Sequence, residues 1–406
     1  MSETHVFTIA AANYLPKVRV LFQSLRRIHP DWRLHLALAD EPNNPLAPHH
    51  VAADEVHSLN ELAIPNWRPW AFGHTLIELA TAMKPFMLRR LLRRPRCKSV
   101  IYLDPDIVVF SPLREIETTL EENNIALTPH LSVAETTIEG VIANELCTSQ
   151  HGIYNLGFIG VAAGPQGRAF GDWWADRLYH FCREDIPSGI YTDQRWIDFV
   201  PAFFDRVAVL RSSRFNVAPW NLAARRLAGT PPSRMTVDGQ PLGFYHFSQV
   251  DNGANDTVIA DQNAAADLTA WYRAETAAAK TAIPYDPSWA LGCFENGEPI
   301  SREQRLVYRL RKDLQQSFPD PYAKGRHSYL TWWQSDARRD FPALFRADTR
   351  GAEIQWLLSS LIYGRGAHDI RTEFRPDNGR SPWVDEMETE RPLGVASRLG
   401  ALLRGA

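Results

Sequence analysis

The fold is decided by the stretch Val100-Ile101-Tyr102-Leu103-Asp104-Pro105-Asp106-Ile107-Val108-Val109-Phe110. Its apolar residues before Asp104 are typical of a buried strand, which places two carboxylates at the carboxyl end of that strand. Unpaired charges beside a core are costly, so we expect a cation to neutralise them. Two carboxylates one residue apart suit a hard divalent ion, Mg²⁺ or Mn²⁺, that keeps positions open for phosphate oxygens.

Apolar residues at alternating spacing and at helical spacing follow one another along the first part of the chain. Residues 6–11 and 34–38 are predicted strands, and residues 18–28 form a helical pattern between them. A strand, a helix and a strand in this order predict a parallel sheet. Further strands are predicted at 125–128, 157–162, 207–210 and 242–247, and further helices at 168–181, 194–199 and 77–92, the last interrupted by Pro85.

The character of the chain changes near residue 275. With 406 residues the chain is long enough for two to three structural units. We predict an α/β domain over residues 1–275, a helical C-terminal extension over 276–375, and a polar, poorly ordered tail over 376–406.

Composition restricts the function classes. The net charge of -3 gives no broad basic field, so no nucleic-acid partner is indicated. Four widely spaced cysteines match no metal-binding spacing and indicate reduced thiols in a cytoplasmic protein. The N-terminal residues do not have the pattern of a signal peptide, and no apolar run approaches the ~20 residues of a membrane span. Any membrane association is therefore expected to be peripheral.

Polar and small residues gather where the predicted strands end. In open α/β sheets, ligands bind outside the carboxyl ends of the strands. Asp104 and Asp106 lie at such an end, and His246 ends the last predicted strand. The others are Ala10, Ala11, Asn13 and Tyr14 after the first strand and Asp40 after the second. Taken singly, the acid pair could be a plain turn and His246 a core histidine.

These positions, with Lys84 and the runs Tyr154-Asn155-Leu156-Gly157-Phe158 and Thr192-Asp193-Gln194, form an ordered set. In order and spacing the set resembles GT-A fold glycosyltransferases, most of all the glycogenin and lipopolysaccharide galactosyltransferase group. The resemblance covers roughly residues 5–265. It implies a Rossmann-like, mixed but mostly parallel sheet flanked by helices, with the helical extension as an appendage.

The resemblance also implies roles for the individual residues. Asp104, Asp106 and His246 would hold Mn²⁺ or Mg²⁺, and Lys84 would add a positive charge at the donor diphosphate. Ala10, Ala11, Asn13, Tyr14, Asp40 and Asp104 would line the pocket for the nucleotide, and Asn155, Asp193 and Gln194 would act on the donor sugar. Retention of configuration is the expectation, while inversion, with Asp193 as general base, stays open. In isolation, an aspartate directly before the helix at Gln194 is more often an N-cap, and the two roles can coexist.

The chain departs from the glycogenin-like pattern after His246. It reads Phe247-Ser248-Gln249-Val250-Asp251-Asn252-Gly253, where those relatives carry Gly-x-x-Lys-Pro-Trp. The diphosphate-binding lysine is therefore missing. Either Lys84 or an arginine such as Arg195 takes its place, or the diphosphate is bound more weakly than in those relatives.

The expected function is sugar transfer from a nucleotide-diphosphate donor, a UDP-sugar by expectation, to a glycan or lipid-linked acceptor. The expected setting is bacterial surface polysaccharide or lipopolysaccharide synthesis at the inner face of the plasma membrane, with the C-terminal helices placing the acceptor or forming a homodimer contact. Two alternatives remain. One is a haloacid-dehalogenase-type phosphatase with Asp104 as nucleophile and Asp106 as general acid. The other is a sugar-nucleotide-binding protein without catalysis.

Overall fold

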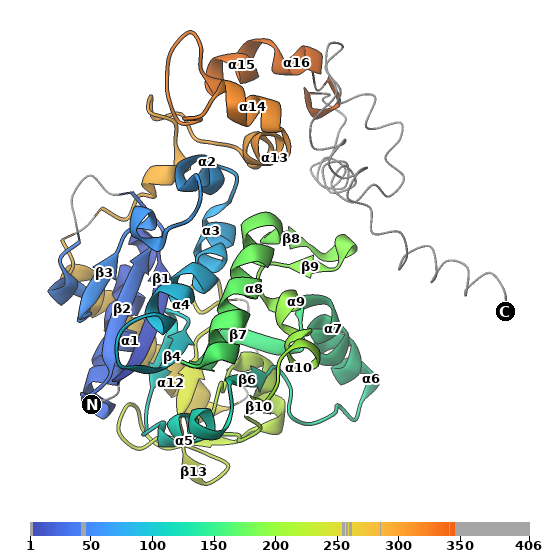
Figure 1. Ribbon diagram of the computed structural model, residues 1–406. Helices are drawn as coiled ribbons and strands as arrows, with labels where there is room; N and C mark the ends of the chain where they lie inside the picture. Colours follow the sequence, from blue (N-terminus) through green and yellow to red (C-terminus); the bar gives the residue numbers. More distant parts are fainter. Residues whose placement is uncertain are drawn as a thin grey trace. The chain divides into compact units, whose positions relative to one another are not determined.

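The computed structural model describes residues 3–41, 46–253, 256, 259, 262–284, 286–340 and 342–345 (Figure 1). The predicted tail at 376–406 and the end of the predicted extension lie outside these residues. The contacts divide the chain into two units. The first comprises Met1–Trp67 and Leu76–Gly292, and the second comprises Arg68–Thr75 and Cys293–Ala406.

A seven-stranded sheet forms the centre of the first unit. Its order is β10-β6-β7-β4-β1-β2-β3, and β7 alone runs antiparallel to its neighbours β4 and β6. The predicted mixed, mostly parallel sheet is therefore confirmed. The strands are β1 (Glu3–Ala10), β2 (Arg33–Leu38), β3 (Glu55–His57), β4 (Cys97–Leu103), β6 (Ile125–Pro129), β7 (Tyr154–Ala162) and β10 (Val207–Val209).

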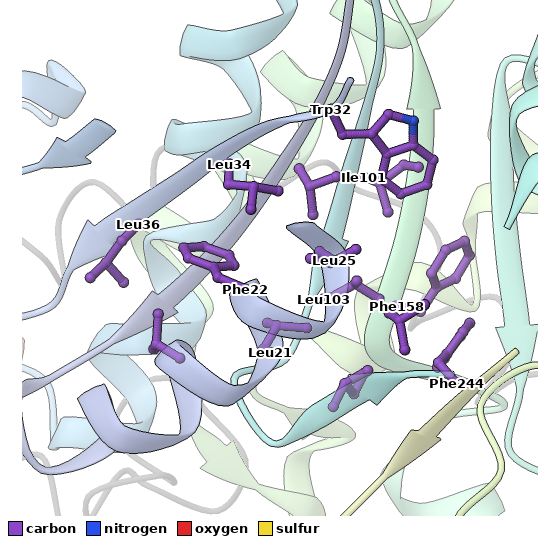
Figure 2. Packing of buried hydrophobic residues seen from close by; sticks show 14 of the residues in the cluster. Leu21, Phe22, Leu25, Trp32, Leu34, Leu36, Ile101, Leu103, Phe158 and Phe244 are labelled. Atoms are coloured by element: carbon purple, nitrogen blue, oxygen red, sulfur yellow. The ribbon is translucent and has the colours of Figure 1, made fainter. Parts of the chain in front are cut away.

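Helices cover both faces of this sheet. On one face lie α1 (Leu15–Ile28) and α5 (Arg114–Glu122); on the other lie α4 (Lys84–Leu92) and α8 (Pro165–Phe181). The apolar residues of α1 recur at helical spacing and meet alternate residues of the strands, and each buried Leu or Phe contributes about 2 kcal/mol. Figure 2 shows this core with Leu21, Phe22, Leu25, Trp32, Leu34, Leu36, Ile101, Leu103, Phe158 and Phe244.

The predicted helix at 77–92 is two helices, α3 (Leu76–Ala82) and α4. Pro85 lacks a backbone N–H, which a helix interior requires but a first helical turn does not. The chain accordingly starts a new helix at Lys84, with Pro85 in its first turn. This break places Lys84 at the beginning of α4.

A second core lies beneath α12 (Asn263–Thr281). Here β14 (Phe244–His246) pairs antiparallel with β5 (Ile107–Val109), with His246 opposite Ile107. The ring of Phe247 stacks on Tyr272 of α12 at 3.8 Å. The pairing places His246 beside the residues that directly precede β5.

The predicted domain boundary at residue 275 lies within α12, whereas the contacts divide the chain after Gly292. The functional division into residues 1–275 and 276–375 stays a prediction.

Short elements complete the first unit. They are η1 (Ala12–Tyr14), η2 (Pro48–Val51), η3 (Leu59–Leu62), α6 (Ile138–Gly140), the π-helix η4 (Val141–Leu146), α7 (Cys147–His151), β8 (Glu184–Asp185), η5 (Ile186–Ser188), β9 (Ile190–Tyr191), α9 (Gln194–Ile197), α10 (Val200–Phe203), η6 (Pro219–Ala224), β11 (Leu227–Ala228), β12 (Thr236–Val237), β13 (Gln240–Pro241) and η7 (Ala290–Gly292).

The second unit is built around aromatic residues. Phe72, at the end of α2 (Trp67–Phe72), makes edge contacts with the rings of Tyr308, Tyr322 and Tyr329. The described helices of this unit are short, and the extended backbone of Arg311 separates the first two after α2. They are α13 (Arg302–Leu310), α14 (Lys312–Ser317), α15 (Tyr329–Ser335), α16 (Ala337–Asp340) and η8 (Pro342–Phe345). Among the described residues, no helix combines the length and the apolar character that crossing a membrane requires.

Candidate metal and nucleotide site

Asp104 and Asp106 lie in a tight turn between β4 and β5. The amide of Asp104 donates to the carbonyl of Gly157 on β7 at 2.8 Å, and the amide of Ile107 donates back to the carbonyl of Asp104 at 3.1 Å. The hydroxyl of Tyr102 donates to Oδ1 of Asp104. Tyr102 lies two residues before Asp104, so both side chains point to the same face of the chain. The turn therefore holds the first carboxylate rigidly at the carboxyl end of β4.

His246 completes a group of three metal-ligand side chains. Its Nε2 lies 3.2 Å from Oδ1 of Asp106 and 3.7 Å from Oδ2 of Asp104. One ligand atom from each of the three residues lies within 4.8 Å of the other two. Two carboxylate oxygens and one imidazole nitrogen that converge in this way fit a divalent ion.

The charges of this group support one another. Burial would raise the pKa of Asp106, but His246 and then Lys17 outweigh it and lower that pKa. Burial would lower the pKa of His246, but Asp106 outweighs it and raises that pKa. Asp106 is thus held as a carboxylate, and a bound cation would supply the positive charge that a protonated His246 would otherwise provide beside it.

Gly157 makes room for the imidazole. A Cβ atom at this position would lie 2.5 Å from Cε1 and 2.6 Å from Nδ1 of His246. The ring of Trp220 meets the imidazole edge to face at 5.3 Å. The imidazole is 4% exposed. The orientation of its Nε2 toward the carboxylates is therefore set by packing, as a metal ligand requires.

Lys84 brings a buried cation to the same place. Its Nζ lies 2.8 Å from Oδ2 of Asp193 and 3.5 Å from Oδ1 of Asp104, and it donates to the carbonyl of Leu156 at 3.0 Å. It also lies 4.4 Å from the centroid of the Tyr102 ring. Burial would lower the pKa of Lys84, but Asp104 and Asp193 outweigh it and raise that pKa. Lys84 is therefore a charged ammonium between Asp193, which is predicted to act on the donor sugar, and Asp104 of the acid pair.

A hydrogen-bond network holds Asn155 and Gln194 beside this group. Oδ1 of Asn155 accepts from the side chain of Asn216 at 3.0 Å and from the amide of Gly157 at 3.1 Å. Oε1 of Gln194 accepts from the amide of Leu156 at 3.1 Å, and its Nε2 donates to a main-chain carbonyl at 2.9 Å. Both amides are thus positioned by the protein at the start of β7. Asp193 occupies the N-cap position of α9, but its side chain makes no capping hydrogen bond.

The residues predicted to line the nucleotide pocket also lie at the carboxyl ends of the strands, but they differ in burial. Ala10 ends β1, Ala11 and Ala10 are buried, Asn13 is exposed, and Tyr14 is half-buried. Asp40 follows β2 and accepts from the amides of Glu41 and Ala290, each at 2.9 Å. Asp40 therefore ties a later segment of the chain to the sheet. Its predicted role at the nucleotide, like the other predicted roles, stays a prediction.

Sequence reasoning missed three residues of this region, which are Lys17, Tyr102 and Asp251. Tyr102 had a detectable signal, because it lies two residues before Asp104 on one strand. Lys17 and Asp251 are paired at 2.6 Å although 234 positions separate them. Nothing in the local pattern of either residue indicates that contact.

Comparisons with known proteins add the following. No protein-family model matches the chain. Among curated proteins, the chain is similar to two uncharacterised proteins of Bacillus subtilis (strain 168). Identity to YfnF is 24% over 246 residues, which are 59% of this chain and 80% of YfnF. Identity to YfnD is 26% over 263 residues, which are 61% of this chain and 78% of YfnD.

Three similar solved structures bear the glycosyltransferase name that the sequence resemblance predicts. The galactosyltransferase LgtC, in complex with donor and acceptor sugar analogues, has 17% identity and a TM-score of 0.39, with 68% of this chain and 95% of that chain covered. GlyE of Streptococcus pneumoniae TIGR4 has 15% identity and a TM-score of 0.39, with 68% and 64% covered. The bifunctional WbbM has 14% identity and a TM-score of 0.38, with 67% and 52% covered.

Proposed function

We propose that the chain is a metal-dependent glycosyltransferase of GT-A type that transfers a sugar from a nucleoside diphosphate donor to a hydroxyl of an acceptor. The observation that carries the proposal is the convergence of Asp104, Asp106 and His246 beside Lys84, at the carboxyl ends of the strands. A site for a divalent cation next to a buried ammonium is suited to a ligand with two linked phosphates.

In the proposed reaction, the bond between the anomeric carbon and the diphosphate oxygen breaks, a bond from that carbon to the acceptor oxygen forms, and the acceptor proton passes to an oxygen of the leaving diphosphate. Asp104, Asp106 and His246 would hold the divalent ion, which would supply Lewis-acid stabilisation of the leaving diphosphate. Lys84 supports this from within the protein, since its ammonium lies between Oδ1 of Asp104 and Oδ2 of Asp193 and orients both carboxylates. Tyr102 donates to the same Oδ1 of Asp104.

We assign Asp193, Asn155 and Gln194 to the donor sugar, as the sequence resemblance implies. Asp193 is 2% exposed and paired with Lys84 at 2.8 Å. Its Oδ2 is occupied by the ammonium of Lys84, and an anion held in this way can stabilise a cationic sugar electrostatically, which is why we propose retention of configuration. Burial raises the pKa of Asp193 although Lys84 lowers it, so general-base catalysis by Asp193, with inversion, is the alternative that the test decides. Determining the anomeric configuration of the product by NMR tests it, because an inverted product would require a free general base.

The two alternatives differ from this proposal in what they require of the site. A phosphatase needs Asp104 as a free nucleophile, yet Oδ1 of Asp104 accepts from Tyr102 and faces Lys84. Because Oδ1 is engaged in this way, Asp104 is not a free nucleophile, and this argues against the phosphatase. A protein that only binds sugar nucleotides would bind the donor and release nothing from it.

The test is release of the nucleoside diphosphate from UDP-, GDP- and dTDP-sugars, with and without Mn²⁺. We expect release from one donor, with a UDP-sugar as the first candidate, that requires Mn²⁺ and is lost in Asp106→Asn. The matched control is Asp176→Asn, the same change on an exposed residue of α8. Binding without release would support the non-catalytic alternative. Release of inorganic phosphate from simple esters would support the phosphatase.

We further propose a glycan or lipid-linked acceptor of bacterial surface polysaccharide synthesis, with the second unit serving the acceptor or a homodimer contact. The four free cysteines agree with a reducing, cytoplasmic setting, and we propose peripheral association with the plasma membrane. Light scattering of the full chain tests the homodimer contact, and vesicle flotation tests the membrane association. A monomer that stays unbound to vesicles would contradict both.

A further inference from the structure

Lys17 is a second, nearly buried cation, and it interacts electrostatically with Asp106 of the acid pair. It lies in the first turn of α1, is 7% exposed, and its Nζ lies 4.2 Å from the centroid of the Tyr14 ring. Burial would lower the pKa of Lys17, but Asp106 in the first place outweighs it and raises that pKa. Lys17 is therefore a charged ammonium that faces one of the proposed metal ligands.

The partner of Lys17 is a carboxylate from the surface. Oδ2 of Asp251 lies 2.6 Å from Nζ of Lys17. The two side chains differ in burial, because 66% of the Asp251 side chain is exposed and only 9% of the Lys17 side chain. The carboxylate can return to water at small cost, whereas the buried ammonium needs an anion in its place.

Asp251 has an exposed side chain on a backbone that is anchored on both sides of it: Arg273 donates to the carbonyl of Val250 at 3.0 Å, and the amide of Asn252 donates to the carbonyl of Gln249 at 3.3 Å. The amide of Phe247 donates to the carbonyl of Asp106 at 2.8 Å, and the Phe247 ring stacks on Tyr272. The amide of Val250 donates to the carbonyl of Phe247 at 3.3 Å. Asp251 follows directly. Its carboxylate can therefore leave Lys17 while the residues next to His246 stay in position.

The two cations that the sequence suggested for the donor diphosphate have other partners. Lys84 pairs with Asp193 and Asp104, and Arg195 pairs with Asp198 at 2.6 Å. Lys17, in contrast, is held by a displaceable surface acid.

We propose that Lys17 binds the diphosphate of the nucleotide donor and that Asp251 occupies Lys17 as an internal anion until the donor displaces it. This inference rests on the proposed function. A diphosphate carries more negative charge than one carboxylate and is held at the same time by the ion beside Asp106, so it wins the exchange. Asp251 then sets the donor affinity by competing with the donor.

The test is calorimetric titration of the full chain with Mn²⁺ alone and with UDP, GDP or dTDP in the presence of Mn²⁺. For the nucleotide that binds, Lys17→Met should weaken binding by about tenfold or more, the size of one lost charge-assisted hydrogen bond. Mn²⁺ alone should bind Lys17→Met at least as well as it binds the wild type, because the change removes a positive charge beside Asp106. If Lys17→Met acted through the metal ligands, it would weaken the binding of Mn²⁺ and of the nucleotide together.

Asp251→Asn should tighten nucleotide binding, since the competing anion is gone. In the double variant Lys17→Met/Asp251→Asn, the nucleotide affinity should equal that of Lys17→Met, because the diphosphate and Asp251 compete only for the ammonium of Lys17. The matched control is Lys98→Met, a change at a surface lysine paired with Glu121. Lys17→Arg keeps the positive charge, so it should retain most of the nucleotide affinity. If it does, the weaker binding of Lys17→Met follows from the lost charge and not from a loss of folding.

The outcomes that overturn the inference are separable. Wild-type binding with an unchanged affinity in Lys17→Met would refute Lys17 as a diphosphate ligand. Weaker binding in Asp251→Asn would refute Asp251 as a competitor. A wild type that binds none of the three nucleotides would refute the proposed function and this inference together.

Discussion

Lys84 is the residue on which the charge balance of the site depends most. It is 3% exposed and lies between Asp193 and Asp104, of which Asp193 is equally buried. A buried ion pair contributes little net stability, but removal of one partner leaves the other charge without compensation. The cost of a substitution therefore depends on what happens to the opposite charge.

We predict that Lys84→Met lowers the free energy of unfolding by about 3–5 kcal/mol. Lys84→Met/Asp193→Asn should cost less than the sum of the two single changes, because the double variant holds one buried carboxylate fewer. Urea titrations of the four proteins measure this. Lys98→Met is the control, with a cost of about 1 kcal/mol or less for an exposed ion pair. Additive losses in the double variant would contradict the assigned coupling.

Gly157 tests the position of His246 without removing any ligand. In Gly157→Ala, the new methyl group would collide with Cε1 and Nδ1 of the imidazole, so the ring must turn away from the acids. We predict at least about tenfold weaker Mn²⁺ binding, the size seen when a support of a metal ligand is lost. Gly164→Ala is the control, since no heavy atom lies within 4 Å of a Cβ there. Equal Mn²⁺ affinity in both variants would show that His246 is not a ligand.

At the scale of elements, His29 connects the end of α1 to the start of α5. Its Nε2 accepts from the amide of Leu113 at 2.9 Å, and its ring stacks on Trp32 at 3.7 Å. Burial lowers the pKa of His29 to about 4. Only the neutral ring can accept this hydrogen bond, so protonation opposes the folded state.

The pH dependence follows from that shift. Between about pH 6.5, where the unfolded chain takes up the proton, and about pH 4, only the unfolded state is protonated at this site. Stability therefore falls as the pH falls through this window, by roughly 3 kcal/mol from His29. In His29→Gln, the amide oxygen can accept from Leu113 without titrating, so urea titrations from pH 7 to 4 should show a shallower decline. A decline as steep as in the wild type would contradict the assignment.

The elements also show what the sequence could reveal. The helices and strands around residues 5–38 were predictable because their apolar residues recur at a fixed spacing, and Pro85 indicated the break between α3 and α4. The antiparallel direction of β7 was not predictable, since alternation along a strand is the same in both directions. Residues that end strands, Asp104 and His246, were predictable members of one site. The pair Lys17 and Asp251 was not, because only the folded chain brings α1 to that segment.

At the scale of the whole molecule, the proposed donor site lies within the first unit. All its residues, from Lys17 to Asp251, belong to that unit, whereas Phe72 belongs to the second. Phe72 is 0% exposed among the rings of Tyr308, Tyr322 and Tyr329. A large cavity at Phe72 should therefore disturb the second unit and leave the donor site intact.

We predict that Phe72→Ala destabilises the second unit by about 3–5 kcal/mol, the usual cost of removing a buried phenyl group. Limited proteolysis should then cut first within residues 293–340, while calorimetry should find the same affinity for Mn²⁺ and nucleotide as in the wild type. The control is Phe203→Ala, a change at an exposed phenylalanine. Lost nucleotide binding with an intact first unit would show that the second unit helps to form the donor site.

The central claim is that Asp104, Asp106 and His246 form a metal site that binds a nucleoside diphosphate. The most direct measurement is thermal unfolding of the wild type, Asp106→Asn and Asp176→Asn with UDP, GDP and dTDP, each with and without Mn²⁺. A ligand at ~100 times its dissociation constant stabilises the folded state by about 2.7 kcal/mol. We predict that one nucleotide stabilises the wild type and Asp176→Asn, only with Mn²⁺, and does not stabilise Asp106→Asn. Stabilisation that is independent of Mn²⁺ and of Asp106, or no stabilisation of the wild type, would contradict the claim.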